Sequence, residues 1–255
     1  MMMGIIQDFI DFTPPQLERT GVAVEFWVRG DDGPDVTGDG ESVATWSDRS
    51  GNARDATQST AAKRPTLQTN EANGLPIVRF DGVDDDMGYG SAEIIPGLYP
   101  QPLTIGVLIR VAGASGRQHL LRIATGQAIE MVLQFTDVAN QSPLLGWRAG
   151  DRRGMSGNFG LSTWDTNSVV VFTSDGVDPA STNWIYTLDG ASQTWARVDI
   201  GGAGNTNFIG SNSADADFFN GDVAEIVIYT GELTASERQR LERYLGSKYG
   251  VVLTQ

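Results

Sequence analysis

The sequence of 255 residues has no cysteine and a single histidine, His119. Without cysteine, disulfide bonds and thiolate metal sites are excluded, so stability has to come from the burial of side chains. Any Ser-His-Asp arrangement or histidine metal site would have to use His119. Because His119 lies in a strand-like segment and no Gly-x-Ser-x-Gly motif accompanies it, we expect a surface or hydrogen-bonded sheet histidine.

Positive charge is also scarce, since 18 Lys and Arg face 32 Asp and Glu and give a net charge of −14. Nucleic acids and anionic lipids attract a basic surface, so neither is an expected partner. Neutral sugars, cations and basic protein surfaces are better matched as partners to this negative charge. No apolar run approaches the ~18 residues that a membrane span needs, and we expect a soluble protein. Residues 1–10 lack Lys and Arg, and Asp8 interrupts their apolar run, so we expect no export signal.

What the sequence does have is turn residues, with 31 Gly and 10 Pro between short apolar or alternating runs. This pattern is typical of an antiparallel all-β fold with two facing sheets. Strands are predicted at 22–29, 42–47, 76–81, 103–112, 118–124, 129–136, 143–148, 168–174, 183–188, 194–199, 206–210 and 222–230. The segments 104–111 and 168–173 are uniformly apolar, which predicts a central place with cover on both faces.

One helix is predicted after Thr234, which forms a capping box with Glu237. Leu241, Leu245 and Tyr249 share one face at helical spacing, and Gly250 ends the helix. Residues 1–20 are interpreted as an N-terminal arm, whose short amphipathic piece ends at the paired prolines, and residues 21–255 as one β-sandwich domain. Phe9 and Ile10 of the arm either dock on a neighbouring molecule or cover an edge of their own domain.

Three segments carry a family resemblance. In 46–58, an aromatic anchor runs into a tight turn built by Asp48, Ser50, Gly51 and Asn52. Residues 76–85 form a strand that enters an acidic Gly turn, and 224–233 lead into the helix. In this order they resemble the laminin-G-like, concanavalin A-like domains of bacterial surface proteins and phage virions, over roughly residues 22–251. The resemblance implies an all-β, two-sheet antiparallel jelly-roll sandwich with one C-terminal α-helix.

Jelly-roll glucanases share this architecture, so we searched for carboxylates on one strand face. Asp222 and Glu225 are the nearest candidates, but an offset of three residues is expected to turn them to opposite faces of a strand. The Glu-x-Asp-x-x-Glu pattern of laminarinase-like hydrolases is absent. We therefore predict that the chain is not an enzyme. Gly201-Gly-Ala-Gly204 lacks the Lys of a phosphate loop and is interpreted as a turn.

Two kinds of binding residue stand out. Acidic residues gather in loops, where they are either solvated turns or a Ca²⁺ site. Laminin-G-like relatives often bind calcium at the sheet rim, so the resemblance implies metal ligands at Asp81 and Asp84. Among the six tryptophans, Trp27 and Trp46 are expected to be buried. Exposed rings can stack on sugars, and this predicts a carbohydrate-binding site at Trp147, Arg148, Trp164 and Asp165. Trp184 and Trp195 are further candidates for exposed rings.

These observations lead to a predicted function. The expected lack of an export signal favours a bacteriophage virion component, such as a capsid decoration, fibre or tail protein, with a lectin-like domain for host polysaccharide. It would be part of an oligomer or assembly and contact other virion or surface proteins through the arm. The alternative is a lectin module at the bacterial cell surface, and a glycoside hydrolase comes third.

Overall fold

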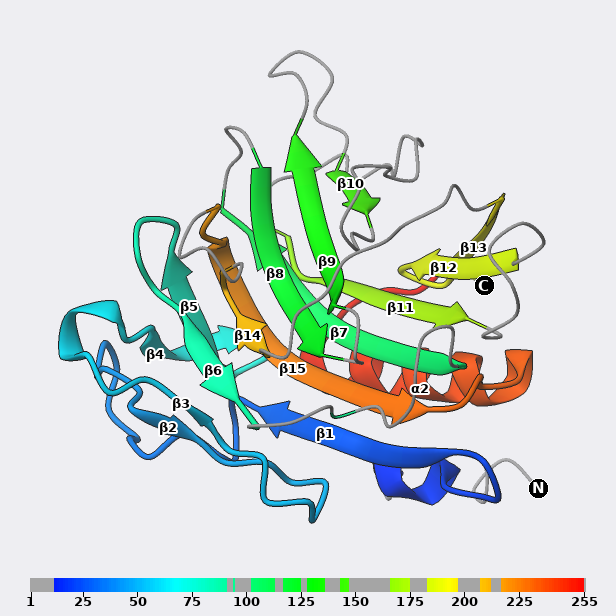
Figure 1. Ribbon diagram of the computed structural model, residues 1–255, viewed down its shortest axis with the longest axis horizontal. Coiled ribbons are helices and arrows are strands. Elements are labelled where there is room, and N and C mark those ends of the chain that lie inside the picture. Colours follow the sequence, from blue (N-terminus) through cyan, green and yellow to red (C-terminus); the bar gives the residue numbers. More distant parts are fainter. Residues whose placement is uncertain are drawn as a thin grey trace.

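The computed structural model describes residues 12–90, 94, 102–112, 117–124, 128–135, 143–146, 166–174, 183–196, 207–211 and 217–254, and the structural statements below refer to these residues. They form two antiparallel β-sheets and one α-helix, which confirms the prediction of an all-β sandwich (Figure 1).

The larger sheet has the strand order β13-β12-β11-β7-β15-β5-β4, and β1 also pairs with β15. β15 pairs with β7 along one edge, while its other edge pairs first with β5 and then with β1. The strands are β1 (Ala23–Arg29), β4 (Thr66–Ala72), β5 (Leu75–Asp81), β7 (Leu103–Val111), β11 (Ser168–Ser174), β12 (Asn183–Leu188), β13 (Ala191–Ala196) and β15 (Asn220–Thr230). Gly30 lets the end of β1 approach β5, because a Cβ there would lie 2.6 Å from the carbonyl oxygen of Pro76.

The smaller sheet has the order β10-β9-β8-β14-β6-β3-β2. Its strands are β2 (Thr45–Trp46), β3 (Ala56–Thr57), β6 (Met87–Tyr89), β8 (Arg117–Ala124), β9 (Ala128–Phe135), β10 (Pro143–Gly146) and β14 (Phe208–Ile209). The two sheets enclose the main apolar core, which includes Phe26, Trp46, Phe80 and Ile105. Trp46 is 0% exposed and Trp27 is 6% exposed, so the prediction that both are buried is confirmed.

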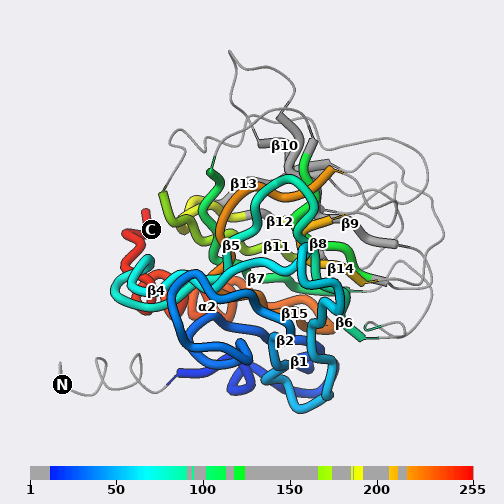
Figure 2. The backbone as a smooth tube through the Cα atoms, turned by 90° about the vertical axis from the view of Figure 1, so that its left-hand side faces the viewer, coloured from blue at the N-terminus to red at the C-terminus, as the bar shows by residue number. Residues whose placement is uncertain are grey.

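Helix α2 (Ala235–Tyr249) covers the outer face of the larger sheet. The capping box of Thr234 and Glu237 is formed, and Gly250 ends the helix with a φ of 75°. Leu241, Leu245 and Tyr249 close a second apolar cluster against β7, β11 and β15. Figure 2 shows the three layers, with the smaller sheet on one side of the larger sheet and α2 on the other.

β7 and β11 lie in the middle of the larger sheet, between α2 and the smaller sheet, which confirms the central place predicted for both apolar segments. Each predicted strand overlaps an observed strand, but the sequence patterns missed β3, β4 and β6. The strand expected at 194–199 is β13, which spans Ala191–Ala196 and forms a hairpin with β12. None of the described helices is both long and apolar enough to cross a membrane.

The described part of the N-terminal arm contacts its own domain. Phe12 is buried and makes an edge-to-face contact with Tyr244 of α2 at 5.4 Å between ring centroids. Leu17, in the 3₁₀ helix η1 (Pro14–Leu17), joins the cluster beneath α2. The hydroxyl of Tyr229 donates to the carbonyl of Pro14 at 3.1 Å. Phe9 and Ile10 lie outside the described residues, so the docking of the arm on a neighbour and the boundary at residue 21 stay predictions.

Candidate functional site

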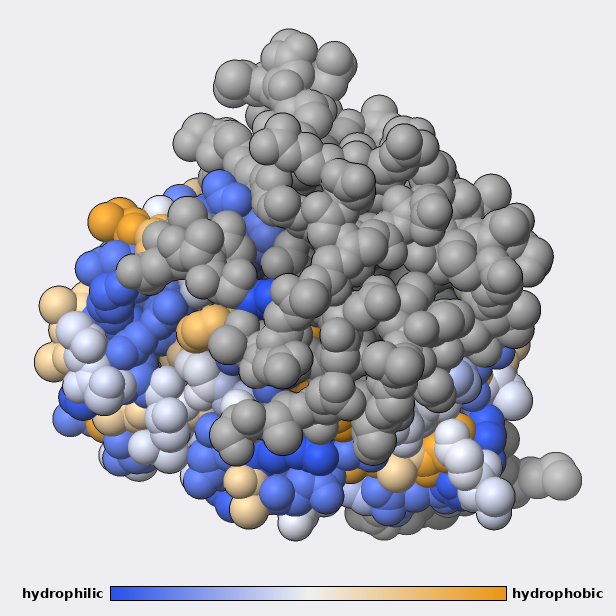
Figure 3. Space-filling model, in the orientation of Figure 1, coloured by the Kyte–Doolittle hydropathy of each residue, from blue (hydrophilic) through white to orange (hydrophobic). Residues whose placement is uncertain are grey.

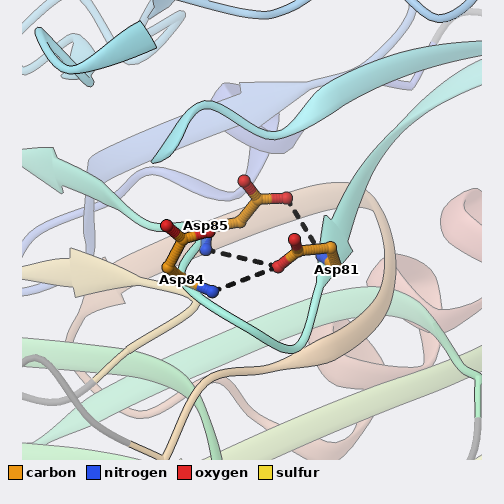
Figure 4. Close-up of side chains that lie close together, drawn as sticks. All are labelled: Asp81, Asp84 and Asp85. Atoms are coloured by element: carbon orange, nitrogen blue, oxygen red, sulfur yellow. Dashed lines mark hydrogen bonds between the residues drawn. The ribbon is translucent and has the colours of Figure 1, made fainter. Parts of the chain in front are cut away.

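The acidic turn after β5 brings together the two predicted metal ligands, Asp81 and Asp84, with Asp85 (Figure 4). One carboxylate oxygen from each lies within 4.8 Å of the others. Asp81 Oδ1 also organises the turn, since it accepts the backbone N–H groups of Val83 at 2.8 Å, Asp84 at 3.2 Å and Asp85 at 3.4 Å. The turn therefore uses one carboxylate oxygen of Asp81 for its own backbone and leaves the other without such a bond.

Asp85 differs from Asp81 and Asp84 because its residue surface is only 6% exposed. Burial, together with the negative charges of Asp81 and Asp84, raises the pKa of Asp85 to about 6. A hard cation such as Ca²⁺ would favour the charged form of these carboxylates and draw oxygen ligands from them. The donor set fits this chemistry, and calcium at Asp81 and Asp84 stays a prediction.

The predicted carbohydrate-binding residues Trp147, Arg148, Trp164 and Asp165 lie outside the described residues. For Trp184 on β12 and Trp195 on β13, the structure describes the backbone alone, which pairs the two residues directly opposite each other. In Figure 3, the coloured part of the visible surface is largely hydrophilic, with scattered hydrophobic residues. The carbohydrate site stays a prediction.

The turn in 46–58 forms hydrogen bonds to the edge of β1. Asp48 Oδ1 accepts the backbone N–H of Trp27 at 3.0 Å, and Asn52 Nδ2 donates to the carbonyl of Val24 at 2.9 Å. Arg54 Nη1 donates to the carbonyl of Glu25 and, at 2.6 Å, to its carboxylate. This confirms that the Asp and Asn side chains hold the turn. It also shows what the turn does, because it saturates backbone groups that the strand would otherwise expose.

Glu225 lies at the centre of a buried polar cluster under α2, with 0% exposure. Its carboxylate accepts hydrogen bonds from Trp27 Nε1 at 2.7 Å, Tyr244 Oη at 2.9 Å, Tyr249 Oη at 2.8 Å and Lys248 Nζ at 2.8 Å. Burial and the nearby charge of Glu225 raise the pKa of both tyrosines above the usual range, so both remain protonated donors. Every contact of this carboxylate ties β15 to β1 or to α2.

The structure corrects our expectation that Asp222 and Glu225 face opposite sides. β15 has a bulge at Ala224, where Val223 pairs with Ile109 and Glu225 already pairs with Leu108. The extra residue shifts the alternation, so that Val223 and Ile226 both belong to the core between the sheets. Asp222 and Glu225 therefore both lie on the outer face of the larger sheet.

Asp222 is 2% exposed and lies between two arginines on the neighbouring strands. Arg79 Nε donates to it at 2.7 Å, and Arg110 Nε at 2.6 Å. The ion-pair partners of Arg79 are Asp222 of β15 and Glu71 of β4. Glu71 was missed because β4 was missed. The Asn73-Gly74 pair is a strong hairpin signal and would have revealed both.

His119 is buried in β8 and has 0% exposure. Its backbone N–H donates to the carbonyl of Asp217 at 2.7 Å, and its Nε2 lies 3.4 Å from a carboxylate oxygen of the same residue. We expected either a surface histidine or a hydrogen-bonded histidine within a sheet, and the structure confirms the second alternative.

No protein-family model and no curated protein matches the chain. Solved structures do share its fold. Domain 4 of AbnA, an extracellular GH43 arabinanase from Geobacillus stearothermophilus, in complex with arabinotriose, aligns with a TM-score of 0.60 and 14% identity. The alignment covers 87% of this chain and 99% of that domain.

Two other neighbours are larger proteins. A mutant of a GH54 α-L-arabinofuranosidase aligns with a TM-score of 0.60 and 14% identity over 93% of this chain and 62% of its own. The sialidase of Trypanosoma rangeli, in complex with sialic acid, aligns with a TM-score of 0.51 and 14% identity over 91% of this chain, which spans 34% of the sialidase. At such identities the likeness establishes the β-sandwich fold alone. It does not single out a laminin-G-like or concanavalin A-like jelly roll.

These neighbours correct two predictions. They come from carbohydrate-active proteins and not from virions, so the predicted phage structural role is wrong. The prediction that the chain is not an enzyme is contradicted as well, because the matched proteins are glycoside hydrolases and a sialidase. The physical basis of that exclusion was also unsound, since it assumed an unbroken two-residue alternation across the bulge at Ala224.

Proposed function

We propose that this chain is a carbohydrate-binding β-sandwich domain of a carbohydrate-active protein. The observation that carries the proposal is the fold it shares with domain 4 of the arabinanase, which was solved with arabinotriose bound and is spanned almost completely by the alignment. A lectin-like jelly roll of the concanavalin A type is the finer form of the same proposal.

The chemistry of the sequence supports a saccharide ligand. Trp147-Arg148 and Trp164-Asp165 each join a flat apolar ring to a polar side chain, the combination that contacts the C–H face and the hydroxyls of a sugar. The negative net charge of −14 disfavours anionic polymers as the general ligand and favours neutral glycans.

The test is calorimetric titration of the chain with neutral oligosaccharides, beginning with arabinotriose. We expect saturable binding that Trp147→Ala or Trp164→Ala weakens about tenfold or more, as the loss of a stacking contact implies. The control is Val252→Ala, at a side chain that is 87% exposed, which should bind like the wild type. Reducing ends are measured in the same samples to detect hydrolysis. A lack of binding across a panel of neutral glycans would reject the proposal.

A further inference from the structure

Four charged residues on four neighbouring strands form a closed ring, which we call the ion ring: Glu71 of β4, Arg79 of β5, Asp222 of β15 and Arg110 of β7. Asp222 pairs directly with Arg79 on one side and with Arg110 on the other. Glu71 closes the ring, with its Oε2 3.1 Å from Arg110 Nη2 and its Oε1 3.6 Å from Arg79 Nη2.

The two carboxylates of the ion ring have unequal positions. Asp222 is 2% exposed and accepts four contacts from the arginines, so it is a fixed part of the sheet. The Glu71 side chain is 32% exposed, far more than Asp222, and contacts both guanidinium groups. The contacts of Glu71 with the two arginines are longer than the contacts that Arg79 Nε and Arg110 Nε make with Asp222. Of the two carboxylates, Glu71 is therefore the more easily displaced.

The backbone around Glu71 is irregular as well. The pairing of β4 with β5 shifts between Gln68 and Ala72, and Asn70 has a φ of 60°. Glu71 thus sits in a break of an edge strand, where fewer ladder hydrogen bonds fix its position. The ion ring lies on the same outer face of the larger sheet as α2. α2 contacts β7 and β11, and its C-terminal end reaches the turn between β4 and β5, where Asn73 Nδ2 donates to the carbonyl of Lys248 at 3.0 Å.

From this geometry we propose that Arg79 and Arg110 form a binding site for the carboxylate of an acidic saccharide, such as a uronic acid, and that Glu71 occupies this site in the free protein. Two guanidinium groups and Asp222 leave one positive charge, which matches a single carboxylate. The contacts of Glu71 show that a carboxylate fits the space. The neighbouring amide of Gln68, 3.3 Å from Arg79 Nη1, adds a group suited to a sugar hydroxyl.

This inference rests on the proposed function and names a ligand class for a second place on the domain. A saccharide is favoured over an acidic protein because the fold neighbours are carbohydrate-active proteins. Arginine suits the site, because its planar guanidinium group can bind a carboxylate through two hydrogen bonds while its other N–H groups remain bonded to Asp222.

The experiment titrates trigalacturonate into the wild type and into Glu71→Gln. Removing the resident carboxylate should tighten binding about tenfold, the scale of one charge-assisted hydrogen bond. The matched control, Glu232→Gln, removes one exposed negative charge beyond the other end of β15 and should leave the affinity unchanged. Arg110→Lys keeps the charge but not the fork, and should abolish the gain when combined with Glu71→Gln.

Thermal unfolding of each variant shows whether the fold is intact. Methyl-esterified trigalacturonate, which lacks the carboxylates, should not respond to Glu71→Gln. Equal affinity of Glu71→Gln and the wild type for trigalacturonate, in a folded protein, overturns the inference, as does an equal gain with Glu232→Gln. Neither result bears on the neutral glycan site, which is tested by arabinotriose and the Trp147 and Trp164 variants. Binding of an acidic peptide with the same response, and not of the saccharide, would also overturn it.

Discussion

At the scale of single residues, Glu225 shows how a fully buried carboxylate is accommodated by hydrogen-bond donors. Four donors on two elements, β1 and α2, surround it, and Lys248 supplies a positive charge while also contacting Asp31 at 2.9 Å. A buried ion pair tolerates the loss of both charges better than the loss of one. The position of α2 on the sheet therefore depends on Glu225 and Lys248 as a pair.

We expect Glu225→Ala to lower the free energy of unfolding by about 3–5 kcal/mol, because the substitution removes one of the two carboxylates that contact Lys248 and leaves the buried donors of Trp27 and Tyr249 without their acceptor. Urea denaturation measures the change. Glu225→Gln keeps an acceptor for Trp27 and should cost less. The exposed Glu232→Gln serves as the control, and a loss below about 1 kcal/mol for Glu225→Ala would show that the cluster is not structural.

At the scale of elements, the edge of β1 shows why the turn at 46–58 is built as it is. An edge strand with free N–H and C=O groups can pair with another chain. Here Asp48, Asn52 and Arg54 bind the backbone of β1 at Trp27, Val24 and Glu25. Asp48 also accepts the backbone N–H groups of Ser50 at 2.9 Å and Arg54 at 3.1 Å, so one carboxylate fixes both the turn and the edge.

Asp48→Ala should therefore destabilise the protein by about 1–3 kcal/mol, since it leaves several donors without an acceptor. Hydrogen exchange at the Trp27 amide should become faster in the same variant. Asp39→Ala is the control, because Asp39 Oδ1 accepts a backbone N–H group of a different strand, that of Thr69 on β4 at 2.8 Å. Its loss should leave exchange at the Trp27 amide unchanged. If the Trp27 amide exchanges at the wild-type rate in Asp48→Ala, the turn does not guard this edge.

The elements also show how far sequence patterns lead. The helix after Thr234 and the strands of the core were predictable, because the capping box and long apolar runs are local signals. β3 and β6 were not, since strands of two or three residues carry no periodic pattern. The bulge at Ala224 has no local signature either. It arises where β15 changes partner from β5 to β1, which only the assembled sheet defines.

The candidate sites also differ in whether local sequence signals reveal them or only the assembled sheet defines them. Asp81 and Asp84 lie close together because they belong to one turn, which the sequence reveals. The ion ring joins Glu71, Arg79, Arg110 and Asp222 across four strands, so its members are neighbours only after the sheet has formed.

At the scale of the whole molecule, the carboxyl groups respond to pH in two opposing ways. Burial raises the pKa of Asp85 to about 6 and also raises the pKa of Asp189 and Glu242. The hydrogen bond from Arg19 and the contacts of Thr234 lower the pKa of Glu237 to about 2. The first group stabilises the folded state when protonated, and Glu237 stabilises it when charged. The excess of negative charge at neutral pH adds repulsion to the first effect.

We therefore expect the melting temperature to be higher near pH 5 than near pH 7.5. Asp85 has an ordinary value of 3.8 in the unfolded chain, so its contribution is full below that value and is lost as the pH rises through about 6. Glu237 contributes fully above 4.5 and loses its contribution as the pH falls toward 2, which sets the acid limit. Thermal unfolding across this range measures the curve. Asp85→Asn removes the main titrating group and should narrow the difference between the two pH values, whereas a wild-type melting temperature that rises from pH 5 to 7.5 would contradict this account.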